Sequence, residues 1–161
     1  MSLTDNRPEG GTGNEDFVIR RFRLEDLSQV ARLVESVFRE KYDVQMYLNL
    51  YQSWPDGFQV VERRGELAAF LLGMISGPRQ VRVLLLAVHP NYRSRGLGSC
   101  LLASFIQAAK ALPADAVTLE VRMSNHRALA FYQRLGFSIT GMIPNYYRDG
   151  ESAHVLVKWL G

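Results

Sequence analysis

Cysteine, histidine and long apolar runs are all scarce in this chain of 161 residues, and each scarcity excludes a class of protein. The single cysteine, Cys100, cannot form an internal disulfide and has no second cysteine with which to share a metal. The histidines at 89, 126 and 154 are not spaced as metal ligands, so we expect no metal. Since no apolar run approaches the roughly 20 residues that span a bilayer, we expect no membrane partner.

The charge of the chain is nearly balanced, with 19 Lys and Arg against 16 Asp and Glu, a formal net charge of +3. This small excess suits an anionic ligand or an acidic partner, but it is far below that of a nucleic-acid-binding protein. Residues 1–15 are rich in Gly, Asn, Thr and acidic side chains, so we expect a disordered leader before a single domain over residues 16–161. The polar start has no apolar signal-peptide core, which predicts a cytoplasmic location.

The spacing of the apolar residues predicts one mixed α+β domain, built around a central sheet that is flanked by helices. Strands are expected over 17–22, 58–62, 67–75, 81–88, 117–122, 137–143 and 153–159. Helices are expected over about 24–38, 45–52, 98–110 and 126–135, the last ended by Gly136. The nearly unbroken apolar run at 81–88 is typical of a strand covered on both faces.

A basic, glycine-bearing turn over residues 93–99 separates a predicted buried strand from a predicted helix. The start of a helix leaves backbone N–H groups unpaired and carries the positive end of the helix dipole. Gly96 and Gly98 let the backbone approach an anion closely, and Arg93 and Arg95 add positive charge, so the turn suits a pyrophosphate. The residues alone also fit a basic turn whose glycines only tighten the junction between strand and helix.

The pattern Arg-x-x-Gly-x-Gly at 93–98 resembles the coenzyme A loop of the GNAT superfamily of N-acetyltransferases. Residues 125–137 are similar to a second signature of that superfamily, with an Asn, a Tyr and a Gly-Phe pair at this spacing. The resemblance implies the GNAT fold and an acetyltransferase that takes acetyl-CoA. It implies cofactor contacts at Leu86, Ala87, Val88, Arg93, Ser94, Arg95, Gly96, Leu97, Gly98, Ser99, Asn125 and Tyr132.

Acetyl transfer to an amine needs a base, because α-amines and lysine amines, with reference pKa values of about 8 and 10.4, are mostly protonated at pH 7. Glu120 lies in mid-strand on the polar face, an unusual place for a carboxylate. From the pattern alone it is either this base or the ion-pair partner of Arg122 or another cation. Residues 119–137 closely resemble the bacterial enzymes that acetylate the N-terminal alanine of a ribosomal protein, and this resemblance implies that Glu120 is the base, acting directly or through a water.

Tyr132 is the candidate general acid, because a phenol can return a proton to the departing thiolate at little cost. The alternative is a core tyrosine that packs beside Phe131 and Leu135. Asn125 either contacts the pantetheine arm or caps the helix that follows it. The resemblance further implies that the pantetheine pairs with strand 86–88 and that the N–H of Val88 polarises the thioester carbonyl.

The acceptor is expected to be a protein or peptide N-terminus. Residues 145–153 are similar to the tyrosine-pair hairpin of N-terminal acetyltransferases, which implies that Tyr146 and Tyr147 hold the first acceptor residues. Residues 38–55 resemble the helix-loop-helix region of the archaeal and eukaryotic catalytic subunits, which implies substrate contacts at Glu40 and Tyr42 and makes Glu40 a second candidate base. Arg82 stands where some archaeal-type enzymes carry a His, which disfavours a His-dependent mechanism.

Other interpretations of the sequence stay open at this point. The tyrosine pair also fits a hairpin stabilised by cross-strand aromatic contacts. The enzyme could instead acetylate a small amine, such as a polyamine, an antibiotic or an amino acid, or the domain could bind acyl-CoA without catalysis. We expect no nucleic-acid partner and a monomer or homodimer.

Overall fold

The structure is a computed structural model that describes residues 16–161, so the leader expected over residues 1–15 lies outside the described residues. Each expected strand and helix is present, with ends that differ by a few residues at most. In chain order the elements are β1 (Phe17–Arg21), α1 (Leu27–Phe38), α2 (Val44–Ser53), β2 (Phe58–Arg63), β3 (Glu66–Gly77), β4 (Gln80–Val88), α3 (Leu97–Ala111), β5 (Ala116–Arg122), α4 (His126–Arg134), β6 (Ser138–Ile143) and β7 (Ala153–Trp159).

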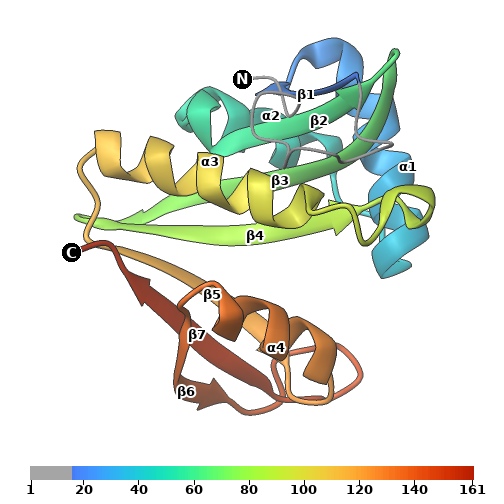
Figure 1. Ribbon diagram of the computed structural model, residues 1–161. Helices are drawn as coiled ribbons and strands as arrows, with labels where there is room; N and C mark the ends of the chain where they lie inside the picture. Colours follow the sequence, from blue (N-terminus) through green and yellow to red (C-terminus); the bar gives the residue numbers. More distant parts are fainter. Residues whose placement is uncertain (1–15) are drawn as a thin grey trace.

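The strands form one mixed sheet in the order β1-β2-β3-β4-β5-β7-β6. Neighbouring strands are antiparallel except β4 and β5, which are parallel. The pairing of β4 with β5 is short, running only from Gln80 opposite Ala116 to Arg82 opposite Thr118. Beyond this point the two strands diverge (Figure 1), so the sheet opens in its middle and exposes an edge of each strand.

A β-bulge in β4 follows directly after Arg82, the last residue that pairs with β5. Consecutive residues of β3 pair with Val83 and Leu85, which leaves Leu84 without a partner on β3. An extra residue bends a strand and reverses the faces of the residues that follow it. Accordingly, Val83 belongs to the core cluster of α3, whereas Leu85 belongs to the cluster of α1 and α2. The bulge therefore turns Leu86, two residues beyond Leu84, toward the α3 side of the opening.

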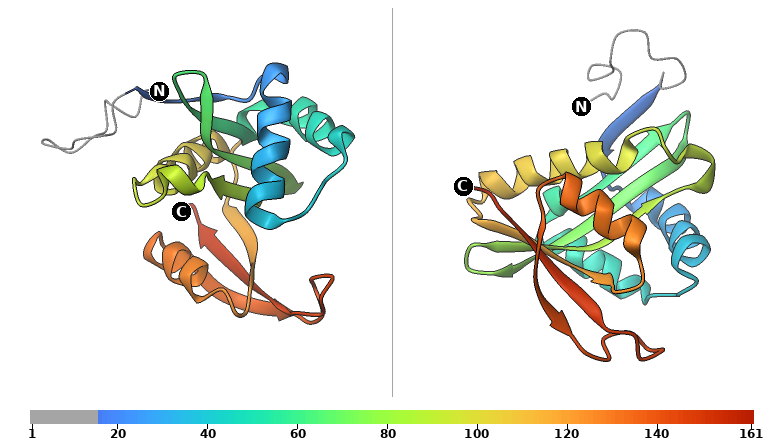
Figure 2. Two further views of the ribbon diagram at one scale, coloured as in Figure 1. Left: turned by 90° about the vertical axis from the view of Figure 1, so that its right-hand side faces the viewer. Right: turned by 60° about the horizontal axis from the view of Figure 1, so that its bottom comes forward.

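Helices cover both faces of the sheet. Helices α3 and α4 lie on one face and α1 and α2 on the other (Figures 1 and 2). The first face is packed around Leu101 and Phe105 of α3, both completely buried. On the second face Phe22 stacks on Phe58, with ring centres 4.0 Å apart and an angle of 5° between the planes. Because each face has its own core, the position of each helix relative to the opening is fixed.

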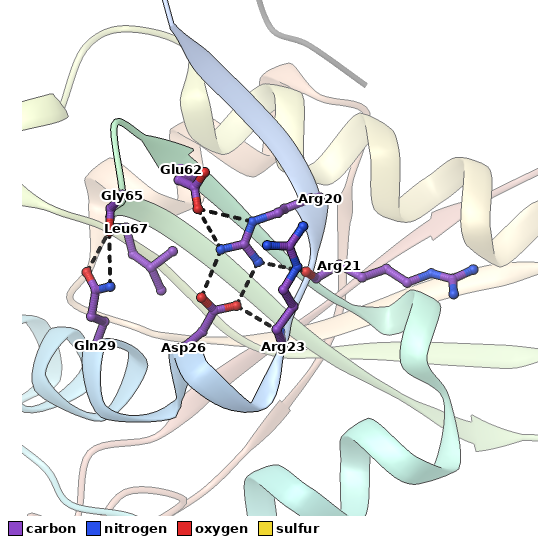
Figure 3. Close-up of polar contacts among 8 residues, drawn as sticks. All are labelled: Arg20, Arg21, Arg23, Asp26, Gln29, Glu62, Gly65 and Leu67. Carbon is purple, nitrogen blue, oxygen red and sulfur yellow. Dashed lines mark hydrogen bonds and ion pairs between the residues drawn. The ribbon is translucent and has the colours of Figure 1, made fainter.

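A buried ion pair fixes the start of α1 on the sheet (Figure 3). Arg20 of β1 binds both oxygens of Asp26, at 2.7 and 2.8 Å, and donates to Glu62 of β2 at 2.8 Å. Asp26 is only 4% exposed and also accepts the backbone N–H of Arg23 at 2.8 Å. One turn further along, Gln29 of α1 bonds the backbone of the β2–β3 turn. These contacts determine the direction of α1, whose last turn reaches the opening between β4 and β5.

Candidate active site

A cavity of about 570 Å³ lies between the start of α3 and α4. Most of the expected cofactor contacts line it, namely Leu86, Val88, Arg93, Ser94, Gly96, Leu97, Gly98, Ser99, Asn125 and Tyr132. Two expected contacts are not among its lining residues. Ala87 is buried in the core cluster of α1 and α2, and the Arg95 guanidinium lies over the ring of Tyr92, 5.8 Å from its centre.

The two glycines of the basic turn are needed for different reasons. Gly96 precedes the first residue of α3 with φ of 76°, a left-handed conformation that costs a residue with a Cβ energy. A Cβ at Gly96 would meet no atom within 4 Å, whereas a Cβ at Gly98 would lie 3.3 Å from the ring of Phe131. Gly96 therefore shapes an open turn, and Gly98 lets α3 approach α4.

The start of α3 presents unpaired donors to the cavity wall. The first bond of the helix runs from the N–H of Cys100 to the carbonyl of Gly96, at 3.0 Å. The N–H groups of residues 97–99 therefore have no acceptor within the helix, and all three residues line the cavity. Unpaired N–H groups beside Arg93 fit the pyrophosphate of coenzyme A.

The free edge of β4 faces the opening of the sheet. The N–H of His89 donates to the carbonyl of Ala68 on β3, at 2.8 Å. Because N–H groups alternate between the two edges of a strand, the N–H of Val88 points away from β3 and toward the opening. The Val88 carbonyl accepts a hydrogen bond from Arg93 Nε at 3.4 Å. The end of β4 thus offers backbone groups beside the basic turn.

A second cavity, of about 420 Å³, lies where β4 and β5 separate. It is lined by Val37 and Phe38 of α1, residues 83–86 of β4, residues 119–122 of β5, and Asn125, Ala128, Tyr132 and Tyr147. Tyr132 and Asn125 line both cavities, so the two cavities meet along α4. Asn125 also caps α4, accepting the N–H of Ala128 at 3.1 Å.

Tyr132 is partly buried at the junction of the two cavities. Burial, with a smaller contribution from Tyr147, raises its pKa well above the usual value of a phenol. Its ring also packs edge-on against Phe131 and Phe137, with centres 5.0 and 5.6 Å apart. The packing expected of a core tyrosine and the exposure expected of a reactive one are therefore both present.

Glu120 lines the second cavity and forms an ion pair, but its partner is Arg82 of β4 rather than Arg122. Arg82 Nε and Nη2 each lie 3.0 Å from a different oxygen of the carboxylate. The same Nη2 donates to the hydroxyl of Tyr146 at 2.6 Å. Arg122 instead binds acidic residues 149 and 151 of the β6–β7 connection, each at 2.9 Å.

The two tyrosines of the β6–β7 connection contact each other edge to face, with ring centres 5.0 Å apart. Tyr147 lines the second cavity, and its ring lies under the guanidinium of Arg122, 4.0 Å from the ring centre. Burial, followed by the proximity of Tyr146, raises the pKa of Tyr147 to about 12. Hydrogen bonds from Ser124 and Arg122 lower the pKa of Glu151 to about 2, so this acid ties the connection to the end of β5 at neutral pH.

Glu40 and Tyr42 lie together in the connection between α1 and α2. The Tyr42 hydroxyl donates to Glu40 at 2.6 Å, and burial followed by this contact raises the pKa of Tyr42. Neither residue is among those that line the second cavity. The charge of Arg148, in the β6–β7 connection, opposes this increase in the pKa of Tyr42.

Sequence reasoning missed part of this site. Phe38 and Leu84 line the second cavity, and Arg82 connects Glu120 of that cavity to Tyr146. Phe38 carried a usable signal, because it is the apolar residue that ends the helix expected over 24–38. Within residues 16–161 we find no group of three or more His, Cys, Asp or Glu side chains that could hold a metal ion. Among the same residues, every helix is too short or too polar to cross a membrane.

This arrangement, in which a parallel strand pair splays beside a basic turn at a helix start, defines an acyl-CoA-dependent acyltransferase. The sequence model of the acetyltransferase (GNAT) family matches residues 27–137, and the chain belongs to that family. The protein is therefore an acetyl-CoA-dependent N-acetyltransferase, and the expected fold, enzyme class and cosubstrate are confirmed.

Two relatives and a solved structure agree with this assignment. The chain is 32% identical to a putative [ribosomal protein bS18]-alanine N-acetyltransferase of Bacillus subtilis, with 88% of this chain and 93% of the relative covered. It is 30% identical to an N-alpha-acetyltransferase of Sulfurisphaera tokodaii, over 88% and 92% of the two chains. The crystal structure of Ard1 from Thermoplasma volcanium superposes with a TM-score of 0.85 at 33% identity, over 89% and 97% of the chains.

Proposed function

We propose that the protein transfers the acetyl group of acetyl-CoA to the α-amine at the N-terminus of a protein or peptide. The observation that carries this proposal is the position of Tyr132, which borders both cavities, while Glu120 and Tyr147 border only the second. A donor in the first cavity and an acceptor in the second would meet beside Tyr132. The names of the N-alpha-acetyltransferase and alanine N-acetyltransferase relatives support the choice of acceptor.

In this proposal Glu120 accepts the proton of the attacking amine, directly or through one water. Arg82 occupies one lone pair on each carboxylate oxygen, and an ionised carboxylate has about four such sites, so positions remain for an amine or a water. The nitrogen then bonds to the thioester carbonyl carbon as the carbon–sulfur bond breaks. Glu40 is the second candidate base, but its carboxylate already accepts the hydroxyl of Tyr42 and does not line the cavity.

Tyr132 is the proposed general acid, donating its proton to the sulfur that leaves. A phenol of ordinary pKa, about 10, is already protonated at neutral pH, and burial raises the pKa of Tyr132 further, so the proton is present when it is needed. The burial that raises the pKa of the phenol also disfavours a charged thiolate beside it, so the transfer stays close to balanced. The N–H of Val88, at the free edge of β4, would stabilise the negative charge that develops on the carbonyl oxygen.

Tyr146 and Tyr147 are the residues proposed to bind the first residues of the acceptor. A tyrosine supplies a rigid ring and one hydroxyl, so a pair can hold a backbone while accepting different side chains. We expect replacement of both by Ala to raise the Michaelis constant for a peptide and to leave acetyl-CoA binding nearly unchanged.

The test of the proposed function is a release assay for free coenzyme A thiol with acetyl-CoA and three sets of acceptors. These are peptides with free N-termini, N-terminally blocked peptides with one internal lysine, and small amines. Turnover that is fastest with free N-termini supports the proposal. Turnover confined to small amines contradicts it and leaves the N-acetyltransferase assignment intact.

A further inference from the structure

Arg82 joins two groups that the proposed mechanism uses separately. Its Nε and Nη2 atoms hold Glu120 at 3.0 Å each, and Nη2 also donates to the Tyr146 hydroxyl at 2.6 Å. The side chains of Arg82 and Glu120 are 29% and 15% exposed, so this contact is largely shielded from water. One guanidinium therefore connects the candidate base, Glu120, to Tyr146, which is proposed to bind the acceptor.

The backbone fixes both ends of the Arg82–Glu120 contact. Arg82 is the last residue of β4 to pair with β5, opposite Thr118, and it directly precedes the bulged part of β4. Glu120 follows Thr118 by two residues and so projects from the same face of β5. The ion pair thus links β4 to β5 at the point where the two strands separate and the second cavity begins.

The donor character of arginine determines the direction of the hydroxyl of Tyr146. A guanidinium carries only donors, so the Tyr146 oxygen accepts from Arg82 and the tyrosine proton must point elsewhere. Tyr146 is 39% exposed, so the proton is available to a bound acceptor. A carbonyl oxygen of a peptide backbone is such an acceptor group. A protonated alkylamine carries only donors and so offers no acceptor at this position.

We propose that Arg82 is a positioning residue that couples peptide binding at Tyr146 to the placement of Glu120; this inference rests on the proposed function. The planar fork of a guanidinium supplies both contacts at once, whereas a lysine ammonium is a point donor on a flexible chain. Binding of a peptide carbonyl to Tyr146 orders Arg82, and Arg82 in turn holds the carboxylate in the cavity.

The experiment compares Arg82→Met, Arg82→Lys, Tyr146→Phe and Glu120→Gln, together with the double variants, in steady-state assays with a free N-terminal peptide. We expect Arg82→Met to raise the peptide KM and to lower kcat, each by about tenfold or more, because each lost hydrogen bond involves a charged group. Addition of Tyr146→Phe should then raise KM little further, and addition of Glu120→Gln should lower kcat little further. Arg82→Lys should restore part of kcat but not the KM.

The matched control is Arg79→Met, which breaks an exposed ion pair with Asp115 near the start of β4 and away from both cavities. This control should keep the wild-type KM and kcat. Acetyl-CoA affinity, measured directly, reports folding and should be unchanged in the Arg82 variants. Fully additive effects in the double variants, or recovery of both constants by lysine, overturn the coupling. Absence of N-terminal acetylation by the wild-type enzyme overturns the proposed function instead.

Discussion

A Cβ atom on Gly98 would lie 3.3 Å from the ring of Phe131, so the first turn of α3 packs directly on α4. The contact joins the basic turn to the helix that carries Tyr132. Gly98 and Phe131 both line the cavity assigned to acetyl-CoA, and a Cβ at position 98 would require the Phe131 ring to shift by a few tenths of an ångström.

The basic turn is tested by Gly96→Glu. The substitution places a side chain in the cavity, strains a backbone with φ of 76° and adds a negative charge beside a bound pyrophosphate. We expect the dissociation constant of acetyl-CoA to rise at least about a hundredfold, since about 3 kcal/mol of repulsion and strain corresponds to that factor. Isothermal titration calorimetry measures it. Gly141→Ala is the control, because a Cβ there meets no atom within 4 Å, and it should bind as the wild type does.

The role of Tyr132 is tested by Tyr132→Phe, which keeps the ring packing and removes the proton donor. A general acid contributes about 10²–10⁴-fold, so kcat should fall by that order while acetyl-CoA binding stays nearly constant. Tyr92→Phe is the matched control, because Tyr92 lines the same cavity and its hydroxyl only reaches Glu66 at 3.3 Å. A Tyr132→Phe rate within about twofold of wild type would reduce Tyr132 to a packing residue.

The role of Glu120 is tested by the pH dependence of Glu120→Gln. The amide keeps the shape of the side chain but cannot take a proton from the amine. Its rate deficit should be largest at low pH, where the α-amine is mostly protonated, and should shrink as pH rises above the amine pKa of about 8. Glu35→Gln, on the exposed face of α1, should show no deficit at any pH. An equal deficit at every pH would assign Glu120 to substrate positioning and make Glu40 the next candidate.

From the ion pair at the start of α1 we predict how the free energy of unfolding depends on pH. Burial raises the pKa of Asp26, but hydrogen bonds from Arg20 and Arg23 outweigh it, so its pKa lies below the ordinary value. The contribution of Asp26 to stability is thus present above the unfolded pKa of about 3.9 and is lost as pH falls through the folded pKa. Asp26→Asn should cost about 1–3 kcal/mol at pH 7, because it removes the charge of one of the two carboxylates that bind Arg20, while Glu62 keeps its contact.

Urea denaturation across this pH range measures the difference in unfolding free energy between wild type and Asp26→Asn. The difference should shrink as pH falls. Asp115→Asn, which removes the acid of the exposed pair with Arg79, should cost much less at pH 7. A constant difference across the range would show that the charge of Asp26 does not support the fold.

Local sequence patterns were sufficient to predict the elements and the basic turn that precedes α3. Apolar periodicity located the helices and strands, since each buries one stripe or face in a continuous core. The basic turn followed from two glycines and two arginines between a strand and a helix start, but the left-handed conformation of Gly96 was not predicted. These features depend on residues that are close in sequence.

The bulge in β4 and the partner of Glu120 could not be predicted in the same way. Every position from Val83 to Val88 is apolar, so no alternation in the sequence marks the change of face at Leu84. Arg82 and Glu120 are 38 positions apart, and Arg82 and Tyr146 are 64 positions apart. Such contacts depend on strand register, which local spacing does not reveal.

The acceptor class is tested most directly by a competition between two peptides whose sequences are the same except at one internal position. One has a free N-terminus and no lysine, and the other is blocked at its terminus and carries an internal lysine. The lower pKa of an α-amine leaves roughly a hundredfold more neutral nucleophile at pH 7 than a lysine does. With acetyl-CoA and wild-type enzyme, mass spectrometry should find the free N-terminal peptide acetylated faster. Faster acetylation of the blocked lysine peptide would contradict the proposed substrate.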